Sequence, residues 1–349
     1  MSSLAKLRPL VQEVIDRTER EKPFITVVGD LILDIQVEGE PGAIHAETGV
    51  PLLKQATSHE SIGGAANIAL ILSRLGAEVA LFGLVGADLP GRQLLETQGR
   101  SRYETHLVTR RGWPTPKKQW IYERAGGRYE LIRRVDFDQP LDAAGREELM
   151  GELRTRYRPE SRVLVLADHG LGALGPETAA IIAQAQSGGA KVVAIPRSNL
   201  PEYRHVTAFV VNPAELQILA SANRVGPPAG ASPAEERKAA DEFARKHHVD
   251  VFLTQGKEGI YVAPGADELP RRLVPAYVVE HPQLMGARDM ALAIISLGYA
   301  LALDLTDAAA LANAFAHLVV QQRGTGVVLW SDIGRLVGLG EPALAGKGA

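Results

Sequence analysis

Short runs of continuous apolar residues alternate along the chain with longer segments whose apolar residues recur at helical spacing. Runs such as FITVVGD and RVLVLAD are typical of strands that are buried on both faces. Strands of this kind, alternating with helices, predict a doubly wound α/β fold in one domain spanning residues 1–349, with a mostly parallel sheet and helices on both faces. The predicted strands are residues 24–30, 79–86, 162–168, 191–195, 208–212 and 250–254, and the predicted helices are residues 67–76, 141–157, 176–187, 213–222 and 233–248.

Two segments break this alternation. Residues 35–58 and 104–135 contain alternating apolar and polar residues, as in PLLKQ and KKQWIYERAGGRYELIRRVDFD. The second segment has strand character on both sides of Gly126-Gly127, which predicts a hairpin that turns there. We expect strands from both segments to form a small β-sheet that projects from the main body as a lid. Two further stretches are expected to be a loop and a frayed tail, residues 224–236 and 340–349.

The composition narrows the class of protein. The chain has 349 residues, 46% hydrophobic and 23% charged, which is ordinary for a soluble globular protein. The formal net charge of -3 argues against a nucleic-acid surface, which needs clustered Lys and Arg. The absence of cysteine excludes disulfides and cysteine metal sites, and it fits a reducing cytoplasm. The longest apolar run, MALAIISLGYALAL, is too short to span a bilayer, and the first residues form an amphipathic helix pattern rather than a signal peptide, so we expect a cytoplasmic protein.

Polar residues end several of the predicted strands. Asp30, Asp168, Asn212 and Thr254 each stand at the carboxyl end of a strand. In doubly wound folds the carboxyl ends of the strands meet at one rim, and ligands bind outside that rim. The sequence therefore predicts a ligand cleft there.

The stretch SIGGAANIALIL places two glycines directly before a helix. Backbone can approach a ligand closely at Gly63 and Gly64, and Asn67 lies in the first helical turn. A tight turn with good packing explains the same residues, so this stretch is a weak signal by itself.

The stretch VVNPAELQIL places Asn212 at a strand end and Glu215 in the first turn of the following helix. Asn as N-cap, Pro213 at the first helical position and Glu at the third form a capping arrangement. Alternatively, Asn212 and Glu215 organise a magnesium-bound phosphate through water, because Mg²⁺ favours sparse carboxylate ligation with retained water. Both interpretations remain open.

The stretch HPQLMGARDMALAI has a glycine turn, then Arg288 and Asp289, then an apolar helix. A helix N-terminus presents unpaired N–H groups and a partial positive charge, so it can hold an anion. A carboxylate there could take a proton from a hydroxyl, or it could simply cap the helix.

Together these segments resemble the ribokinase/PfkB family of carbohydrate kinases, from about residue 24 to residue 330. GGAANIALILSRLGAEVALFGLVGADLPG matches the family's N-terminal signature, and NPAE matches its Asn-x-x-Glu motif. LTQGKEG matches its Thr-x-Gly-x-x-Gly segment, and ALANAFAHLVVQQRGTGVV matches the helix that borders the adenine. GARD occupies the position of the Gly-Ala-Gly-Asp anion hole and base. Within the family the chain is most similar to the kinase half of the bifunctional ADP-heptose synthesis enzymes, whose opening motif is GDLILD here.

The resemblance implies a ribokinase-like fold and an ATP-dependent reaction, in which a hydroxyl of a sugar or sugar phosphate attacks the γ-phosphate with Mg²⁺ present. Asp289 would be the base, and backbone N–H groups of Gly286, Ala287 and Arg288 would hold the transferring phosphoryl group. Lids of the family often pair between subunits, and pairing would cover exposed strand edges, so we expect a homodimer through the lid strands. The implied sugar-binding residues are Asp30, Asp34, Gly63, Gly64, Asn67, Lys118 and Asp168; the implied nucleotide-binding residues are Asn212, Glu215, Thr254, Gly256, Gly259 and Asn313, with Glu215 contacting Mg²⁺ through water.

The chain departs from the family pattern around the expected phosphate. The family's Asp-Thr-Thr is QLM at residues 283–285, which removes hydroxyl groups. Leu171 stands where the heptose-kinase-like enzymes have lysine, and the family's Asp-Pro-Lys is IPR at residues 195–197. Arg288 replaces the third glycine of the anion hole.

Arg288 leaves two interpretations open. If its guanidinium points inward, it could neutralise phosphate charge; if its bulk fills the hole, ATP could not seat its γ-phosphate. The loss of one anion-hole donor typically costs ~10²–10³ in rate. Two hypotheses therefore stand: an active sugar kinase with an altered phosphate pocket, or a weak or inactive kinase-like protein that binds a sugar or nucleotide.

Overall fold

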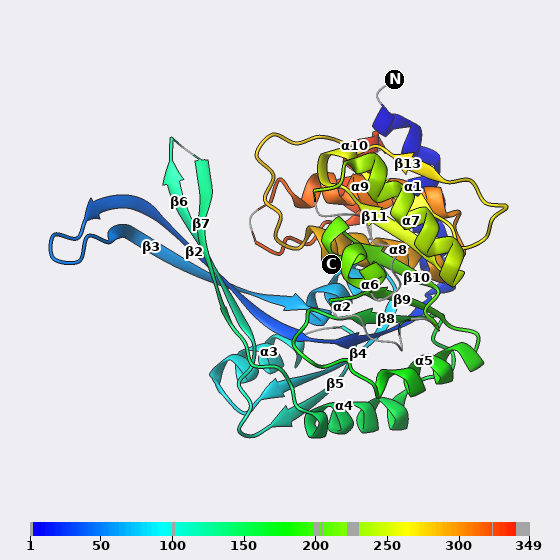
Figure 1. Cartoon of the computed structure of the whole chain (residues 1–349), viewed down its shortest axis with the longest axis horizontal. Helices are drawn as coiled ribbons and strands as arrows, with labels where there is room; N and C mark the ends of the chain where they lie inside the picture. The colour runs from blue at the N-terminus through cyan, green and yellow to red at the C-terminus, as the bar shows by residue number, and fades with distance from the viewer. Residues whose placement is uncertain are drawn as a thin grey trace.

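The computed structural model of the chain describes residues 3–99, 102–126, 128–197, 203, 205–221, 230–322 and 324–339. Figure 1 shows an α/β body from which a long, narrow sheet extends to one side. Three predictions fall outside the described residues, in whole or in part: the tail at 340–349, the loop over 224–229, and Gly127 of the hairpin turn.

Nine strands form the main sheet within the described residues. Seven neighbouring strands are parallel, and two antiparallel strands complete one edge. This arrangement confirms the predicted doubly wound, mostly parallel sheet. Across the sheet the strands are β13 (Arg272–Val274), β12 (Ile260–Ala263), β11 (Asp250–Thr254), β10 (Ala208–Val211), β9 (Lys191–Ile195), β8 (Val163–Ala167), β1 (Phe24–Gly29), β4 (Glu78–Gly86) and β5 (Glu104–Arg110).

Helices cover both faces of the main sheet, and successive side chains of each strand enter opposite cores. Val27 and Val165 face one core, and Val28 and Leu166 face the other. The first core is covered by α1 (Arg8–Glu21), which follows the short helix η1 (Ser3–Leu7), and by α2 (Ala65–Arg74), α3 (Leu89–Gly99), α8 (Ala287–Ala300), α9 (Leu305–Val319) and α10 (Trp330–Val337); the second is covered by α4 (Ala143–Arg156), α5 (Thr178–Ser187), α6 (Pro213–Ser221) and α7 (Pro233–His247).

The projecting sheet has four strands and forms the predicted lid (Figure 1). Its two central strands are parallel to each other, and each outer strand pairs antiparallel with its neighbour. The hairpin turns between Ala125 and Arg128, as predicted. Across the sheet the strands are β3 (Pro51–Gly64), β2 (Leu31–Ile44), β6 (Lys117–Ala125) and β7 (Arg128–Phe137).

The lid differs from the prediction in its bounds. Its first two strands begin at Leu31 and end at Gly64, so they are longer than the predicted segment 35–58. The first part of the predicted segment 104–135 was wrongly assigned to the lid, because β5 pairs in parallel with β4 at the edge of the main sheet. Most side chains of this edge strand are half-buried and most are polar, so its sequence ETHLVTR lacks the continuous apolar run of the central strands.

In the described part of the chain, no helix combines the length and apolar character that a bilayer crossing requires. The longest apolar run instead forms α8, whose Leu292 and Ile295 are fully buried in the first core.

Candidate active site

A cavity of about 520 Å³ lies at the carboxyl ends of the parallel strands, between the lid and the N-terminus of α8. Its position follows the rule for doubly wound sheets, and its volume is typical of a small-molecule site. The lid contributes Asp34 and Lys118, the strand ends contribute Asn212 and Thr254, and α8 contributes Asp289. The structure therefore brings residues from all three regions to one cavity.

Asp289 lies in the first turn of α8 and is 8% exposed. The Asn67 side chain donates a hydrogen bond to Asp289 Oδ2 at 3.0 Å, and His169 Nε2 lies 3.9 Å from Oδ1. Burial raises the pKa of Asp289, while the Asn67 hydrogen bond and the Arg288 charge oppose that rise. Asn67 thus positions the carboxylate, although the resemblance implied a sugar contact.

Gly286 precedes α8 and sits in the left-handed region, with φ of 75°. Most side chains are strained there, so glycine allows the chain to turn sharply into the helix. No side chain caps this helix end, and Gly286, Ala287 and Arg288 all line the cavity. The first turn of α8 therefore presents backbone and partial positive charge to the cavity.

Asp34 and Lys118 are register partners on β2 and β6 and face the cavity together. The Trp120 indole N–H donates to Asp34 Oδ1 at 3.0 Å, and desolvation by burial raises the pKa of Asp34 to about 6. Gly63 leaves room for this carboxylate, because a Cβ there would lie 2.1 Å from Asp34 Oδ2. Lys117 instead lies over the Phe137 ring, so of these two adjacent lysines only Lys118 lines the cavity.

Asp30 and Asp168 lie behind the cavity wall and do not line it. Asp30 accepts hydrogen bonds from the backbone N–H groups of His169, Leu171 and Ala173. Asp168 accepts from the backbone of Gly170 and Arg197 and from the Tyr203 hydroxyl. Both carboxylates shape the loop after β8. Gly64, by contrast, lines the cavity, and a Cβ there would lie 2.2 Å from the Asp30 carbonyl oxygen.

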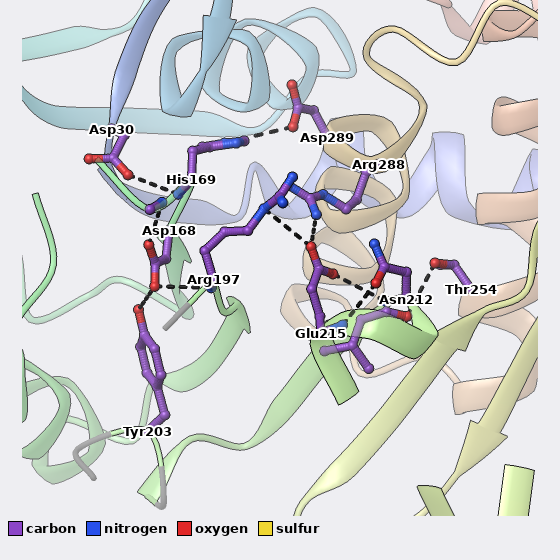
Figure 2. A network of polar contacts seen from close by, with 12 residues as sticks. Asp30, Asp168, His169, Arg197, Tyr203, Asn212, Glu215, Thr254, Arg288 and Asp289 are labelled. Atoms are coloured by element: carbon purple, nitrogen blue, oxygen red, sulfur yellow. Dashed lines mark hydrogen bonds and ion pairs between the residues drawn. The ribbon is translucent and has the colours of Figure 1, made fainter. Parts of the chain in front are cut away.

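Asn212 and Glu215 form a reciprocal cap at the start of α6. The Glu215 N–H donates to Asn212 Oδ1 at 2.9 Å, and the Asn212 N–H donates to Glu215 Oε2 at 3.1 Å. Glu215 Oε1 accepts a hydrogen bond from Arg288 and lies 3.3 Å from Arg197 Nε. Figure 2 shows the two guanidinium groups meeting at this carboxylate, while Asp289 points the other way toward His169.

The far end of the cavity is mostly apolar and includes Ile260, Tyr277 and Val320. Thr254, Gly256 and Gly259 line it; Gly256 begins the short helix η3 (Gly256–Glu258), and Gly259 follows that helix. A Cβ at Gly259 would lie 2.1 Å from the Val274 carbonyl oxygen, so only glycine fits. The Asn313 amide donates to the Val274 and Pro275 carbonyl groups at 2.8 and 3.3 Å and holds this wall in place.

The site offers a poor set of ligands for a resident metal ion. Among the described residues, no group of three His, Cys, Asp or Glu side chains could hold one. The residue predicted to contact magnesium, Glu215, is 2% exposed at its side chain and is paired with Arg288 and Arg197. Both Glu215 oxygens therefore have partners, which leaves neither free for the predicted magnesium contact.

Sequence reasoning overlooked two cavity residues. His169 follows Asp168 at the end of β8, and burial lowers its pKa well below the usual value. Arg134 stacks on Trp120 with its guanidinium carbon 4.5 Å from the ring centroid. The strand-end position of His169 was an available signal, but only the fold places Arg134 in the cavity.

A doubly wound sheet, a four-stranded lid and an acid at the N-terminus of a buried helix define the ribokinase-like class of sugar-kinase folds. The chain matches the model of the pfkB family of carbohydrate kinases over residues 22–332, and it belongs to that family.

Solved structures share this fold at low sequence identity. Phosphofructokinase-2 from Escherichia coli in complex with potassium superposes with a TM-score of 0.69 at 17% identity, over 91% of this chain and 98% of that chain. Arabidopsis thaliana ribokinase complexed with ribose and ATP gives 0.65 at 16% identity, over 90% and 98%.

Curated relatives are more similar in sequence. The bifunctional protein HldE of Magnetococcus marinus is 32% identical over 320 residues, which covers 87% of this chain and 62% of that protein. The HldE of Aeromonas hydrophila is 30% identical over 315 residues, which covers 89% and 62%. The chain thus spans less than two thirds of the length of these relatives.

Proposed function

We propose that this protein is an ATP-dependent kinase that phosphorylates a hydroxyl of a sugar or sugar phosphate. The observation that carries the proposal is Asp289: a buried carboxylate at the N-terminus of α8, held by Asn67 and facing the cavity. A carboxylate whose pKa is raised by burial is a better proton acceptor than a solvated one. The chain belongs to a family of carbohydrate kinases, so the reaction proposed for this acid is phosphoryl transfer to a sugar hydroxyl.

The proposed chemistry is a direct transfer. Asp289 takes the proton of the sugar hydroxyl, the hydroxyl oxygen forms a bond to the γ-phosphorus, and the bond from that phosphorus to ADP breaks. The first turn of α8 at Gly286–Asp289 faces the group in transfer with backbone N–H groups and the helix dipole. Catalysis then consists of positioning and electrostatic stabilisation, as phosphoryl transfer requires.

The binding roles follow the two ends of the cavity. Asp34, Gly64 and Lys118 lie at the lid end and are proposed to bind the sugar, with Gly63, Asn67, Asp30 and Asp168 shaping their surroundings. The apolar end with Thr254, Gly256 and Gly259 is proposed to bind the nucleotide, with Asn212, Glu215 and Asn313 holding its walls. Magnesium is proposed to enter on the phosphates of ATP, without a protein-bound site.

Turnover tests this function directly. Purified protein is mixed with ATP, MgCl₂ and a panel of heptose, ribose and fructose phosphates, and ADP release is followed. We expect turnover with at least one sugar phosphate and its loss in Asp289→Asn. No ADP release with any member of the panel, together with a sugar-induced thermal shift, would mean that the protein only binds.

We also propose that the protein is a homodimer through its lids, in the cytoplasm. The lid exposes large apolar side chains, including Ile44 at 68%, Ile132 at 51% and Phe137 at 46%. The outer strands β3 and β7 also leave one edge each unpaired within the described chain, and pairing with a second lid would cover those edges. The cytoplasmic assignment rests on the lack of cysteine. Light scattering that gives the mass of a monomer would contradict the dimer.

A further inference from the structure

The strongest unassigned feature is the group of Arg288, Arg197 and Glu215: the two arginines line the cavity, and Glu215 is buried behind them. Glu215 carries the motif expected to serve magnesium, yet both of its oxygens already have partners. Oε2 accepts from the Asn212 N–H at 3.1 Å, and Oε1 contacts both arginines. A buried carboxylate requires such partners, because an uncompensated buried charge is costly.

The two arginines outnumber the carboxylate that they share. Arg288 is 19% exposed and Arg197 is 42% exposed at the side chain, and both line the cavity. A guanidinium has five N–H donors in a planar fork, so a contact with Glu215 leaves donors for a second anion. Although desolvation lowers the pKa of Arg288 to about 10, the side chain remains charged at neutral pH.

The whole cavity repeats this excess of positive charge. Among the described residues that line it, five side chains are basic and two are acidic, although the chain carries a formal net charge of -3. Positive charge concentrated in a concave site attracts anions and repels cations. The basic residues are Lys118, Arg134, Arg197, Lys257 and Arg288.

A divalent cation and a pair of arginines serve the same electrostatic purpose at a phosphate. Two guanidinium groups supply two positive charges and add directional, bidentate hydrogen bonds to phosphate oxygens. A magnesium ion placed beside Glu215 would meet both guanidinium groups at short range.

We infer that Arg288 and Arg197, held by Glu215, form an anion site that binds the phosphate of a nucleotide or of a phosphorylated sugar directly, without a divalent cation. Arg288 is then a phosphate clamp in the position of a glycine, rather than an obstruction. This inference rests on the proposed function only in taking the ligand to be phosphorylated.

Calorimetry with ADP tests the inference, once with excess EDTA and once with MgCl₂. We expect the two dissociation constants of the unmodified protein to agree within about threefold. Arg288→Ala should weaken ADP binding in EDTA by roughly 10- to 100-fold, which is the contribution of about one hydrogen bond to a charged group. Arg288→Lys keeps the charge but loses the fork, so we expect an intermediate loss.

The matched control is Arg20→Ala, which removes the same charge from an exposed position on α1, 67% exposed at its side chain. This variant should bind ADP as the unmodified protein does. Thermal unfolding curves for each variant separate lost binding from lost folding. A parallel titration with fructose 6-phosphate in EDTA shows whether a sugar phosphate uses the same site, because its binding should then also weaken in Arg288→Ala.

Two results would overturn the inference. One is ADP and sugar phosphate binding that is unchanged in a folded Arg288→Ala protein. The other is ADP binding to the unmodified protein that is at least tenfold tighter with magnesium than with EDTA. Neither result depends on turnover. An active kinase that needs magnesium to bind ADP would contradict the anion site but not the proposed function. An inactive protein that binds ADP in EDTA would contradict the proposed function but not the anion site.

Discussion

The two ends of one cleft treat their acidic residues in opposite ways. At the lid end, Asp34 and Asp289 are buried with few hydrogen-bond donors, and burial raises the pKa of both. The proposed phosphate corner is the part of the cleft where Arg288 and Arg197 meet. There, both oxygens of Glu215 have partners, which include the two arginines. Acidic side chains in one cleft therefore differ in what surrounds them: burial favours the protonated form of Asp34 and Asp289, and two guanidinium groups compensate the charge of Glu215.

The largest effect is expected at the lid end. Asp289→Asn keeps the size of the side chain but removes the proton acceptor, so kcat should fall by ~10²–10⁴. Sugar binding, followed by thermal shift, should persist because the cavity walls are unchanged. Residual turnover within tenfold of the unmodified protein would show that another group takes the proton.

The next effect is expected at the phosphate corner. Arg288→Gly removes donors from the group in transfer, and kcat should fall by ~10²–10³ at saturating ATP and MgCl₂. The direction of the change is decisive, because an obstructing arginine would give faster turnover when it is removed. Steady-state rates of the two proteins under identical conditions provide the measurement.

Protonation of Asp34 is expected to make the free energy of unfolding depend on pH. Burial raises its pKa from 3.8 to about 6, so the folded state binds the proton more tightly than the unfolded state does. The resulting stabilisation is complete below about pH 4 and is lost as the pH rises through about 6, and it amounts to at most ~3 kcal/mol. Urea unfolding of the unmodified protein and Asp34→Asn between pH 4 and pH 8 isolates this difference. A difference between the free energies of unfolding of the two proteins that stays the same at every pH would contradict this prediction.

The smallest effect compares two adjacent lysines. Lys118 faces the cavity, whereas Lys117 lies over Phe137. Lys118→Ala should raise KM for the sugar phosphate by about tenfold, the scale of one charged contact. Lys117→Ala is the matched control and should leave KM within about twofold. Equal changes in both variants would place neither lysine at the substrate.

The sequence predicts the main sheet well because buried parallel strands are continuous apolar runs. RVLVLAD and DVFLT, for example, contain β8 and β11 nearly residue for residue. The assignment fails at β5, because its half-buried position at the edge of the sheet leaves it without a continuous apolar run. The apolar pattern reports how deeply a strand is buried, and not the sheet to which the strand belongs.

The site is predictable in position but only partly in detail. Asp30 and Asp168 each follow a strand, and this position correctly predicts that they lie at the rim of the sheet. The position does not predict that both face the loop after β8 rather than the cavity. The pairing of Arg288 with Glu215 joins residues 73 positions apart, and no local motif contains both. Which of two interpretations holds at Asn212 and Glu215 depends on that distant arginine.

Strands β2 and β3 of the lid join the body without a hinge segment. Only Asp30 separates β1 from β2, and β3 ends at Gly64 directly before α2, which carries Asn67. Asn67, which donates a hydrogen bond to Asp289, therefore lies three residues beyond the end of a lid strand. A displacement of β3 would pass through this short connection to the side chain that positions the proposed proton acceptor.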